Sequence, residues 1–295
     1  MNTKTTTKTN LSPKHKINRA TVSSFLFKTI CLLLMTLLAI SFLYVMLWMV
    51  LSSFRDRIAY YKFPLKIFDF KSYSLDAYKT VFSYKFDDRI SYFEMIFNSI
   101  IHISIGVIIG LIFEPLIGYV MAKFKFKRLN AFLMFLIIIT MTIPNIGTVF
   151  YTVKLMNFTL NLKDSWFNLI IQLAGGINFS AVIYMNYFNN IPTDYAESAY
   201  LDGASEFKAY RSIYFVLCAP LLIATTVLRI IAFWNDYYSI FLYMPNRPTV
   251  AYGVWYMQAD FEMDKQYTAS FAALTLTSTI SICSSFKALQ ACTPA

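Results

Sequence analysis

The residues that could do chemistry gather in one short polar stretch, ESAYLDGASEF, which runs from Glu197 to Phe207 between two of the most apolar parts of the chain. It combines the carboxylates of Glu197 and Asp202 with small side chains and a central Gly203. This combination suits docking, because small and aromatic groups fill a pocket on another protein while acids set the orientation. The alternative is an amphipathic surface helix whose acids are solvated.

No arrangement typical of catalysis accompanies this stretch. His15 and His102 have no partner at a fixed short spacing, and the four cysteines show no metal-ligand spacing. The sequence also lacks a Gly-x-x-x-x-Gly-Lys phosphate-binding loop, so any ATP that is used must bind another chain. We therefore expect no enzyme activity of this chain alone, no cofactor and no metal.

A second polar group, Trp234-Asn235-Asp236, lies near the end of an apolar run. A flat aromatic face beside an amide and a carboxylate would suit a sugar. An interface anchor is the alternative, because Trp and Tyr collect at membrane edges, and Tyr237 and Tyr238 favour it.

Two ionisable residues, Glu114 and Arg229, interrupt apolar runs. A charge in the hydrocarbon costs about 2.5–3.5 kcal/mol or more. At the helical rise, Glu114 lies about 13 Å from the membrane edge at Lys123, and Arg229 lies about 14–26 Å into its own span. The two are level and can pair if the Arg229 helix enters the membrane late. The alternative is that Arg229 lines a cavity and reads an acidic or phosphorylated sugar.

Composition decides the class of element that positions these residues. The 295-residue chain is 57% hydrophobic and 14% charged, with a mean hydropathy of +0.52. Soluble domains are about 25% charged. These values predict an all-α, polytopic membrane protein. The net charge of +10 does not indicate nucleic acid, because the basic residues lie at the edges of apolar runs and form no stripe.

Six apolar runs are each long enough to cross the hydrocarbon of a bilayer. They divide the chain into a basic tail (1–28), a transmembrane domain (29–286) with a polar loop (190–211), and a short tail (287–295). The predicted spans are 29–51, 94–122, 129–153, 165–189, 212–237 and 266–286.

The orientation follows from the basic cluster at 123–128, which packs four Lys or Arg directly at a membrane edge. Short dense clusters weigh most in the positive-inside rule. We therefore expect both termini and the polar loop 190–211 to lie in the cytoplasm.

The polar loop contains signals for two short helices. Asn189 to Asp194 offers cap-forming residues and a proline suited to a first turn. Gly203 suits the position after a helix end, because it takes positive φ without a Cβ penalty. Ser205 can then cap a second helix that continues toward Pro220.

These residues carry a resemblance to a known family. Glu197-Ser198-Ala199, Asp202-Gly203-Ala204, Ile213 and Pro220 resemble the EAA loop of ABC importer permeases, with Ser198 at the second position of the motif. Four further stretches are similar to the carbohydrate-uptake branch, the group of the maltose-transporter permeases. They are Asn98-Ser99, Tyr119 to Arg128, Met141 to Asn145, and Trp234-Asn235-Asp236.

The resemblance implies a type I permease fold in the plasma membrane that moves a sugar or oligosaccharide inward. The loop would be a coupling helix seated in a cleft of an ATPase subunit, with Glu197, Ala199 and Gly203 docking and Asp202 supporting the turn. The implied partners are a second permease, an ATPase dimer, an extracytoplasmic solute-binding protein and the lipid bilayer. The alternatives are an ion-gradient-driven secondary transporter and an ABC importer of phosphorylated sugars or glycerophosphodiesters.

The chain departs from the family pattern at three places. The family usually has uncharged residues at the positions of Glu114 and Arg229. The run 266–286 contains nine Ser or Thr, and the sequence after Ile280 does not fit. A truncated end, a frameshift or a genuine short variant would each explain the last departure.

Overall fold

The computed structural model describes residues 19–66, 68–124, 127–143, 145–174 and 178–292. The chain divides into two compact units, Met1–Leu51 and Ser52–Ala295. The described part of the first unit belongs to a single helix, α1 (Arg19–Ser53). Because α1 begins before the predicted span, residues 19–28 of the predicted basic tail are helical, and residues 1–18 of that tail lie outside the described residues.

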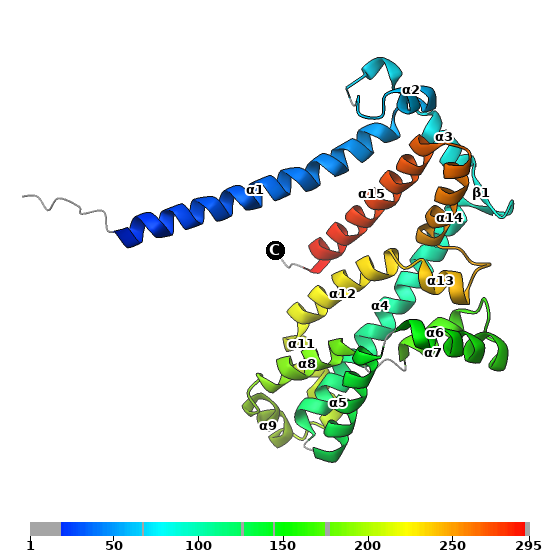
Figure 1. Cartoon of the computed structure of the whole chain (residues 1–295). Coiled ribbons are helices and arrows are strands. Elements are labelled where there is room, and N and C mark those ends of the chain that lie inside the picture. Colours follow the sequence, from blue (N-terminus) through cyan, green and yellow to red (C-terminus); the bar gives the residue numbers. More distant parts are fainter. Residues whose placement is uncertain (1–18, 67, 125–126, 144, 175–177, 293–295) are drawn as a thin grey trace, which may run out of the picture. The chain divides into compact units, whose positions relative to one another are not determined.

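The second unit is built from helices, as predicted for an all-α chain (Figure 1). Its only strands within the described residues are β1 (Lys85–Phe86) and β2 (Ile90–Ser91), which pair as an antiparallel hairpin. The α-helices are α2 (Arg57–Lys62), α3 (Asp76–Ser83), α4 (Tyr92–Lys123), α5 (Lys127–Thr142), α6 (Asn145–Val153), α7 (Trp166–Ala174), α8 (Phe179–Asn189), α9 (Asp194–Leu201), α10 (Glu206–Ala209), α11 (Phe215–Leu217), α12 (Ala219–Trp234), α13 (Tyr238–Tyr243), α14 (Val250–Met263) and α15 (Tyr267–Cys292). Three further turns are a 3₁₀ turn (Phe70–Ser72) and two π-helical segments (Lys154–Thr159 and Tyr210–Tyr214).

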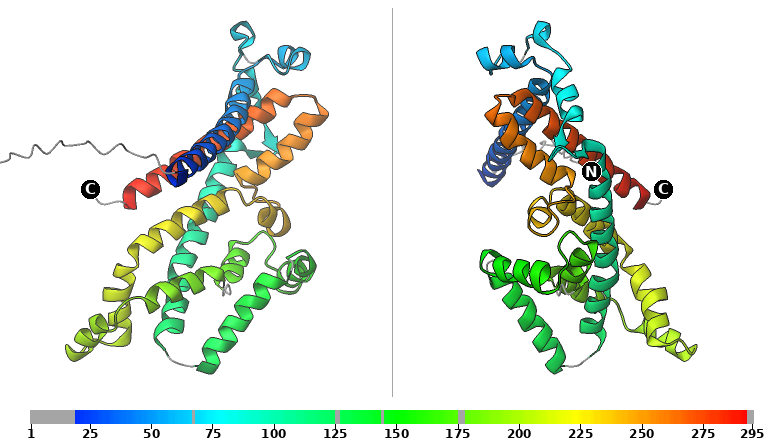
Figure 2. Two further views of the ribbon diagram at one scale, coloured as in Figure 1. Left: turned by 60° about the vertical axis from the view of Figure 1, so that its left-hand side comes forward. Right: turned by 90° about the vertical axis from the view of Figure 1, so that its right-hand side faces the viewer.

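Helix α4 forms the spine of this unit and packs against α7, α8, α12 and α14 (Figure 2). A capping box starts it: Ser91 accepts from the Glu94 N–H, and Glu94 accepts in return from the Ser91 N–H. Its two ends reach separate apolar cores. One lies around Tyr92, Met95 and the helices α3, α14 and α15, and the other around Tyr119 and helix α8. Helix α4 therefore connects the two cores.

The predicted spans differ in how continuous they are. Within the described residues, Ser24–Ser53 and Tyr92–Lys123 are long and apolar enough to cross a membrane. A third candidate consists of Glu206–Leu217 and Ala219–Trp234, which are bent by 72° at Cys218. The predicted spans 129–153 and 165–189 are each divided into two helices, α5 with α6 and α7 with α8. The predicted span 165–189 also contains a pair of glycines, Gly175 and Gly176, a residue type that permits close helix packing in membranes; both lie outside the described residues.

The loop between the first two predicted spans is folded rather than open. It contains α2, α3 and the hairpin, and α3 packs against α15. Arg55 is 1% exposed and donates hydrogen bonds to the backbone carbonyls of Ala59 and Pro64, which holds the start of this loop. Helix α15 continues to Cys292, so most of the predicted tail 287–295 extends the last helix.

Candidate functional site

The polar loop folds into the expected helix, glycine turn and helix. Helix α9 ends at Leu201, and Gly203 has a φ of +78°. The Gly203 N–H bonds to the Tyr200 carbonyl and the Ala204 N–H to the Ala199 carbonyl, at 3.0 and 2.9 Å. This is the Schellman pattern, in which glycine avoids the Cβ penalty of the left-handed region. The predicted role of Gly203 in ending the helix is confirmed.

The start of the second helix is also confirmed. Ser205 is in the extended conformation and its hydroxyl accepts from the Lys208 N–H at 3.3 Å. Helix α10 then continues through a π-helical segment to Tyr214 and ends in α11. The start of α9 differs from expectation, because Thr193 precedes it in a helical conformation with no side-chain cap bond.

The surface of this loop is unusually apolar for a solvent-facing turn. Leu201 is 89% exposed, Phe207 68% and Tyr195 55%. Among the predicted site residues, Glu197, Ser198, Asp202 and Gly203 are exposed, and Ala199 and Ala204 are half-buried. Exposed apolar groups rimmed by acids are typical of a protein-binding surface. Phe207 was not among the apolar groups that the sequence suggested for docking, although its position in a charged loop was a usable signal.

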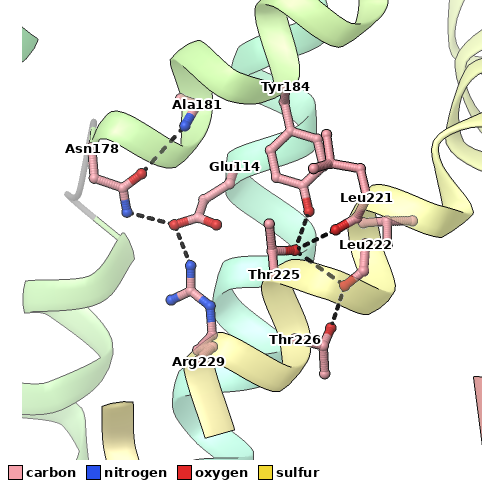
Figure 3. A network of polar contacts seen from close by, with 9 residues as sticks. All are labelled: Glu114, Asn178, Ala181, Tyr184, Leu221, Leu222, Thr225, Thr226 and Arg229. Carbon is pink, nitrogen blue, oxygen red and sulfur yellow. Dashed lines mark hydrogen bonds and ion pairs between the residues drawn. The ribbon is translucent and has the colours of Figure 1, made fainter. Parts of the chain in front are cut away.

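Deeper in the helices, Glu114 and Arg229 form the ion pair that the sequence allowed (Figure 3). Arg229 Nη2 contacts Glu114 Oε1, and the two side chains are only 15% and 4% exposed. Asn178 Nδ2 donates to the same oxygen at 2.5 Å, while its own Oδ1 accepts from the Ala181 N–H at the start of α8. Three helices, α4, α8 and α12, therefore meet at one carboxylate.

The pair depends on local backbone features. Helix α12 begins only at Ala219, after the bend at Cys218. This late start is the condition under which the sequence predicted that Arg229 is level with Glu114. Gly110 lies one turn before Glu114, and a Cβ at that position would overlap the Arg229 guanidinium. The missing side chain of Gly110 thus lets the guanidinium cross the face of α4. The sequence analysis did not identify Asn178 as a partner of this pair, although Asn before an apolar run is a recognisable helix-capping signal.

The group at 234–236 is divided by the fold. Trp234 is 3% exposed, whereas the Asn235 side chain is exposed and donates to the Ile231 carbonyl at 2.8 Å. Asp236 Oδ1 accepts from the Ser239 N–H at 3.0 Å, and its Oδ2 lies 3.4 Å from His102 Nε2. The sequence offered His102 no partner at a fixed short spacing, and the fold brings its Nε2 beside Asp236, an acid that lies far along the chain.

The described residues contain no cluster of three or more His, Cys, Asp or Glu that could hold a metal ion. Long apolar helices, a buried ion pair between them and an exposed apolar turn at one end define a class of protein: a helical membrane protein with an apolar turn outside its candidate spans.

Comparison with known proteins identifies the family. Residues 115–292 match the family described as the binding-protein-dependent transport system inner membrane component. The chain therefore belongs to this family and is a permease component of an ABC importer. This membership disfavours the ion-gradient-driven alternative.

Individual relatives extend the match over nearly the whole chain. The maltodextrin transport system permease protein MdxG of Bacillus subtilis is 28% identical over 92% of this chain and 94% of its own length. The trehalose/maltose transport system permease protein MalG of Thermococcus litoralis is 29% identical over 70% of this chain and 72% of its own.

A solved structure of another transporter shares the fold. It belongs to a bacterial ABC transporter involved in the import of the acidic polysaccharide alginate, and one of its chains superposes with a TM-score of 0.73 at 22% identity. The superposition covers 95% of this chain and 99% of that one. The predicted type I permease fold is confirmed.

Proposed function

We propose that this chain forms half of the translocation path for a sugar or oligosaccharide and couples to ATPase subunits through helix α9 and the turn after it. The observation that carries the proposal is the exposed apolar tip of this loop, with Leu201 89% exposed. Apolar surface in contact with water is unfavourable, and a partner that covers Leu201 would remove this side chain from water. Family membership makes the ATPase the natural partner.

The individual residues have distinct roles in this proposal. Glu197 and Ser198 face the partner and set the orientation of α9, and Ala199 allows close approach. Asp202 ends the helix, and Gly203 with Ala204 forms the turn that directs the chain into α10. No atom lies within 4 Å of a Cβ built on Gly203, so the space beside it is open to a partner.

The solute is proposed from the relatives, whose names describe maltodextrin and trehalose/maltose transport. Asn235 is the exposed polar side chain of the 234–236 group and is our first candidate for a solute contact, with Asp236 beside it. Trp234 is buried within the chain and would support them. The pairing of Arg229 with Glu114 favours a structural role over the reading of an acidic or phosphorylated sugar.

The proposed assembly contains a second permease, an ATPase dimer and an extracytoplasmic solute-binding protein. The chain lies in the plasma membrane with both termini and α9 in the cytoplasm. This orientation rests on the basic cluster at 123–128, which ends α4 and starts α5.

Co-purification tests the docking site. The chain is expressed with the permease and ATPase subunits encoded beside it, and the ATPase is captured in detergent. We expect the wild type to be captured and Leu201→Asp and Gly203→Pro to be lost. Met263→Asp is the matched control, since Met263 is 81% exposed on α14, at the other end of the unit (Figure 1). Capture of Leu201→Asp at the wild-type level would refute the docking surface.

A further inference from the structure

Glu206, the first residue of α10, joins two separate helices through one oxygen atom. Its Oε2 accepts hydrogen bonds from the Tyr200 hydroxyl at 2.7 Å and from the Tyr119 hydroxyl at 3.1 Å. Tyr200 belongs to α9, the proposed coupling helix, and Tyr119 belongs to α4. The carboxylate is therefore the link between the docking surface and the central helix.

The Tyr119 end of this link is rigid. Tyr119 is 3% exposed and its ring packs against Tyr210 at 4.9 Å and Tyr214 at 5.1 Å between ring centroids. Phe188 adds an edge-to-face contact at 6.0 Å. Because close-packed aromatic side chains have little rotamer freedom, the Tyr119 hydroxyl moves with α4.

The other side of α9 is fastened to the same helix. Lys123, the last residue of α4, donates to the Ile191 carbonyl at 3.1 Å and lies 4.9 Å from the centroid of the Tyr214 ring. Ile191 precedes α9 and Tyr200 lies near its end, so the two contacts hold both ends of the helix. A displacement of α9 must then displace α4 or break these bonds.

The Tyr200 hydroxyl is the donor in its bond to Glu206. Burial, followed by the hydrogen bond to Glu206, raises the pKa of the Tyr200 hydroxyl. Tyr200 thus remains a proton donor at neutral pH, and the Glu206 carboxylate is the acceptor. Hydrogen bonds to an ionised group are stronger than neutral ones.

The route continues into the membrane domain. Glu114 precedes Tyr119 on α4 by little more than one helical turn and pairs with Arg229 of α12. A movement received at Tyr119 therefore reaches α12, whose far end carries Asn235 and Asp236.

We propose that Glu206 is a positioning residue for transport, which transmits the movement of α9 to α4 through Tyr200 and Tyr119. The proposal rests on the function proposed above, because it assumes that an ATPase moves α9. It predicts that loss of the link uncouples ATP hydrolysis from transport while the complex still assembles.

The test uses the assembled transporter in proteoliposomes with its solute-binding protein. The variants are Glu206→Ala, Tyr119→Phe and the double variant. Glu262→Ala, an exposed glutamate on α14, is the control for the first. Tyr214→Phe is the control for the second, because Tyr214 packs in the same aromatic cluster but its hydroxyl does not bond to Glu206. Three quantities are measured: ATPase co-purification, ATP hydrolysis and maltodextrin uptake.

We expect Glu206→Ala and Tyr119→Phe to retain the ATPase subunits and to raise the ATP hydrolysed per solute by about ten- to hundredfold, the factor for one hydrogen bond to a charged group. The double variant should be no worse than Glu206→Ala, and both controls should match the wild type.

Two results would overturn the inference alone: a wild-type ratio of ATP to solute in both variants, or loss of the ATPase from the complex, which would make Glu206 a docking residue. A wild-type chain that captures no ATPase would overturn the proposed function and this inference with it.

Discussion

The Glu114–Arg229 pair offers a quantitative test of how the membrane domain is held together. The perturbation is a set of three variants: Glu114→Gln, Arg229→Gln, and both together. Each single change leaves one charge at a site where the side chains are 4% and 15% exposed. The double change leaves two neutral amides and no buried charge at the site.

The magnitude follows from the burial. Breaking a buried ion pair by removing one partner costs about 3–5 kcal/mol, whereas replacing both partners is often neutral. Solvent screening reduces this little, because neither side chain is more than 15% exposed. At about 2–4 °C per kcal/mol, each single variant should lower the Tm by about 6–20 °C.

The assay is thermal unfolding of the detergent-solubilised protein, followed by the fraction that stays monodisperse after heating. We expect the double variant to unfold within about 4 °C of the wild type, which corresponds to about 1–2 kcal/mol. Additive damage, with the double variant worse than either single one, would refute the pair as a stabilising unit. Equal Tm values for all four proteins would show that the contact contributes nothing.

Three further predictions concern single positions. Gly110→Ala should cost about 1–3 kcal/mol, since the new Cβ overlaps the Arg229 guanidinium, and should cost less in the Arg229→Gln background; thermal unfolding of both tests this. Gly203→Ala should cost about 1 kcal/mol, because φ is +78°, and should weaken ATPase capture less than Gly203→Pro does in the same co-purification. The third concerns Tyr84, whose hydroxyl donates to Asp260 at 2.5 Å; burial and then this bond raise its pKa above its usual 10. The folded state thus holds the Tyr84 proton more tightly, so the advantage of wild type over Tyr84→Phe should be present at about pH 8 and shrink as the pH rises past about 10, measured as the difference in Tm.

Local patterns in the sequence were sufficient to predict the polar loop. Gly203 ends a helix through its own positive φ, and the Ser205 hydroxyl caps a backbone N–H three residues later. Both roles involve only neighbouring residues, so they can be predicted without knowledge of the rest of the chain. The long apolar stretch of α4 and its basic end were equally plain.

Span continuity was less predictable. Apolar length alone suggested unbroken helices over 129–153 and 165–189, but the structure divides both. Hydropathy counts the energy of transfer and does not record where backbone hydrogen bonding is interrupted, so a broken helix and a straight one give the same signal.

The sequence by itself determined the class of protein, the family and the local shape of the docking loop. Composition and the lengths of apolar runs are read directly from the chain, and helix capping depends only on neighbouring residues. Only the tertiary structure decided the partners of isolated polar groups. Whether Glu114 reaches Arg229 depended on where α12 begins. The contacts of His102 with Asp236 and of Tyr119 with Glu206 join residues that lie far apart in the chain. Such contacts are set by how several helices pack around α4, and no spacing along the chain encodes that packing.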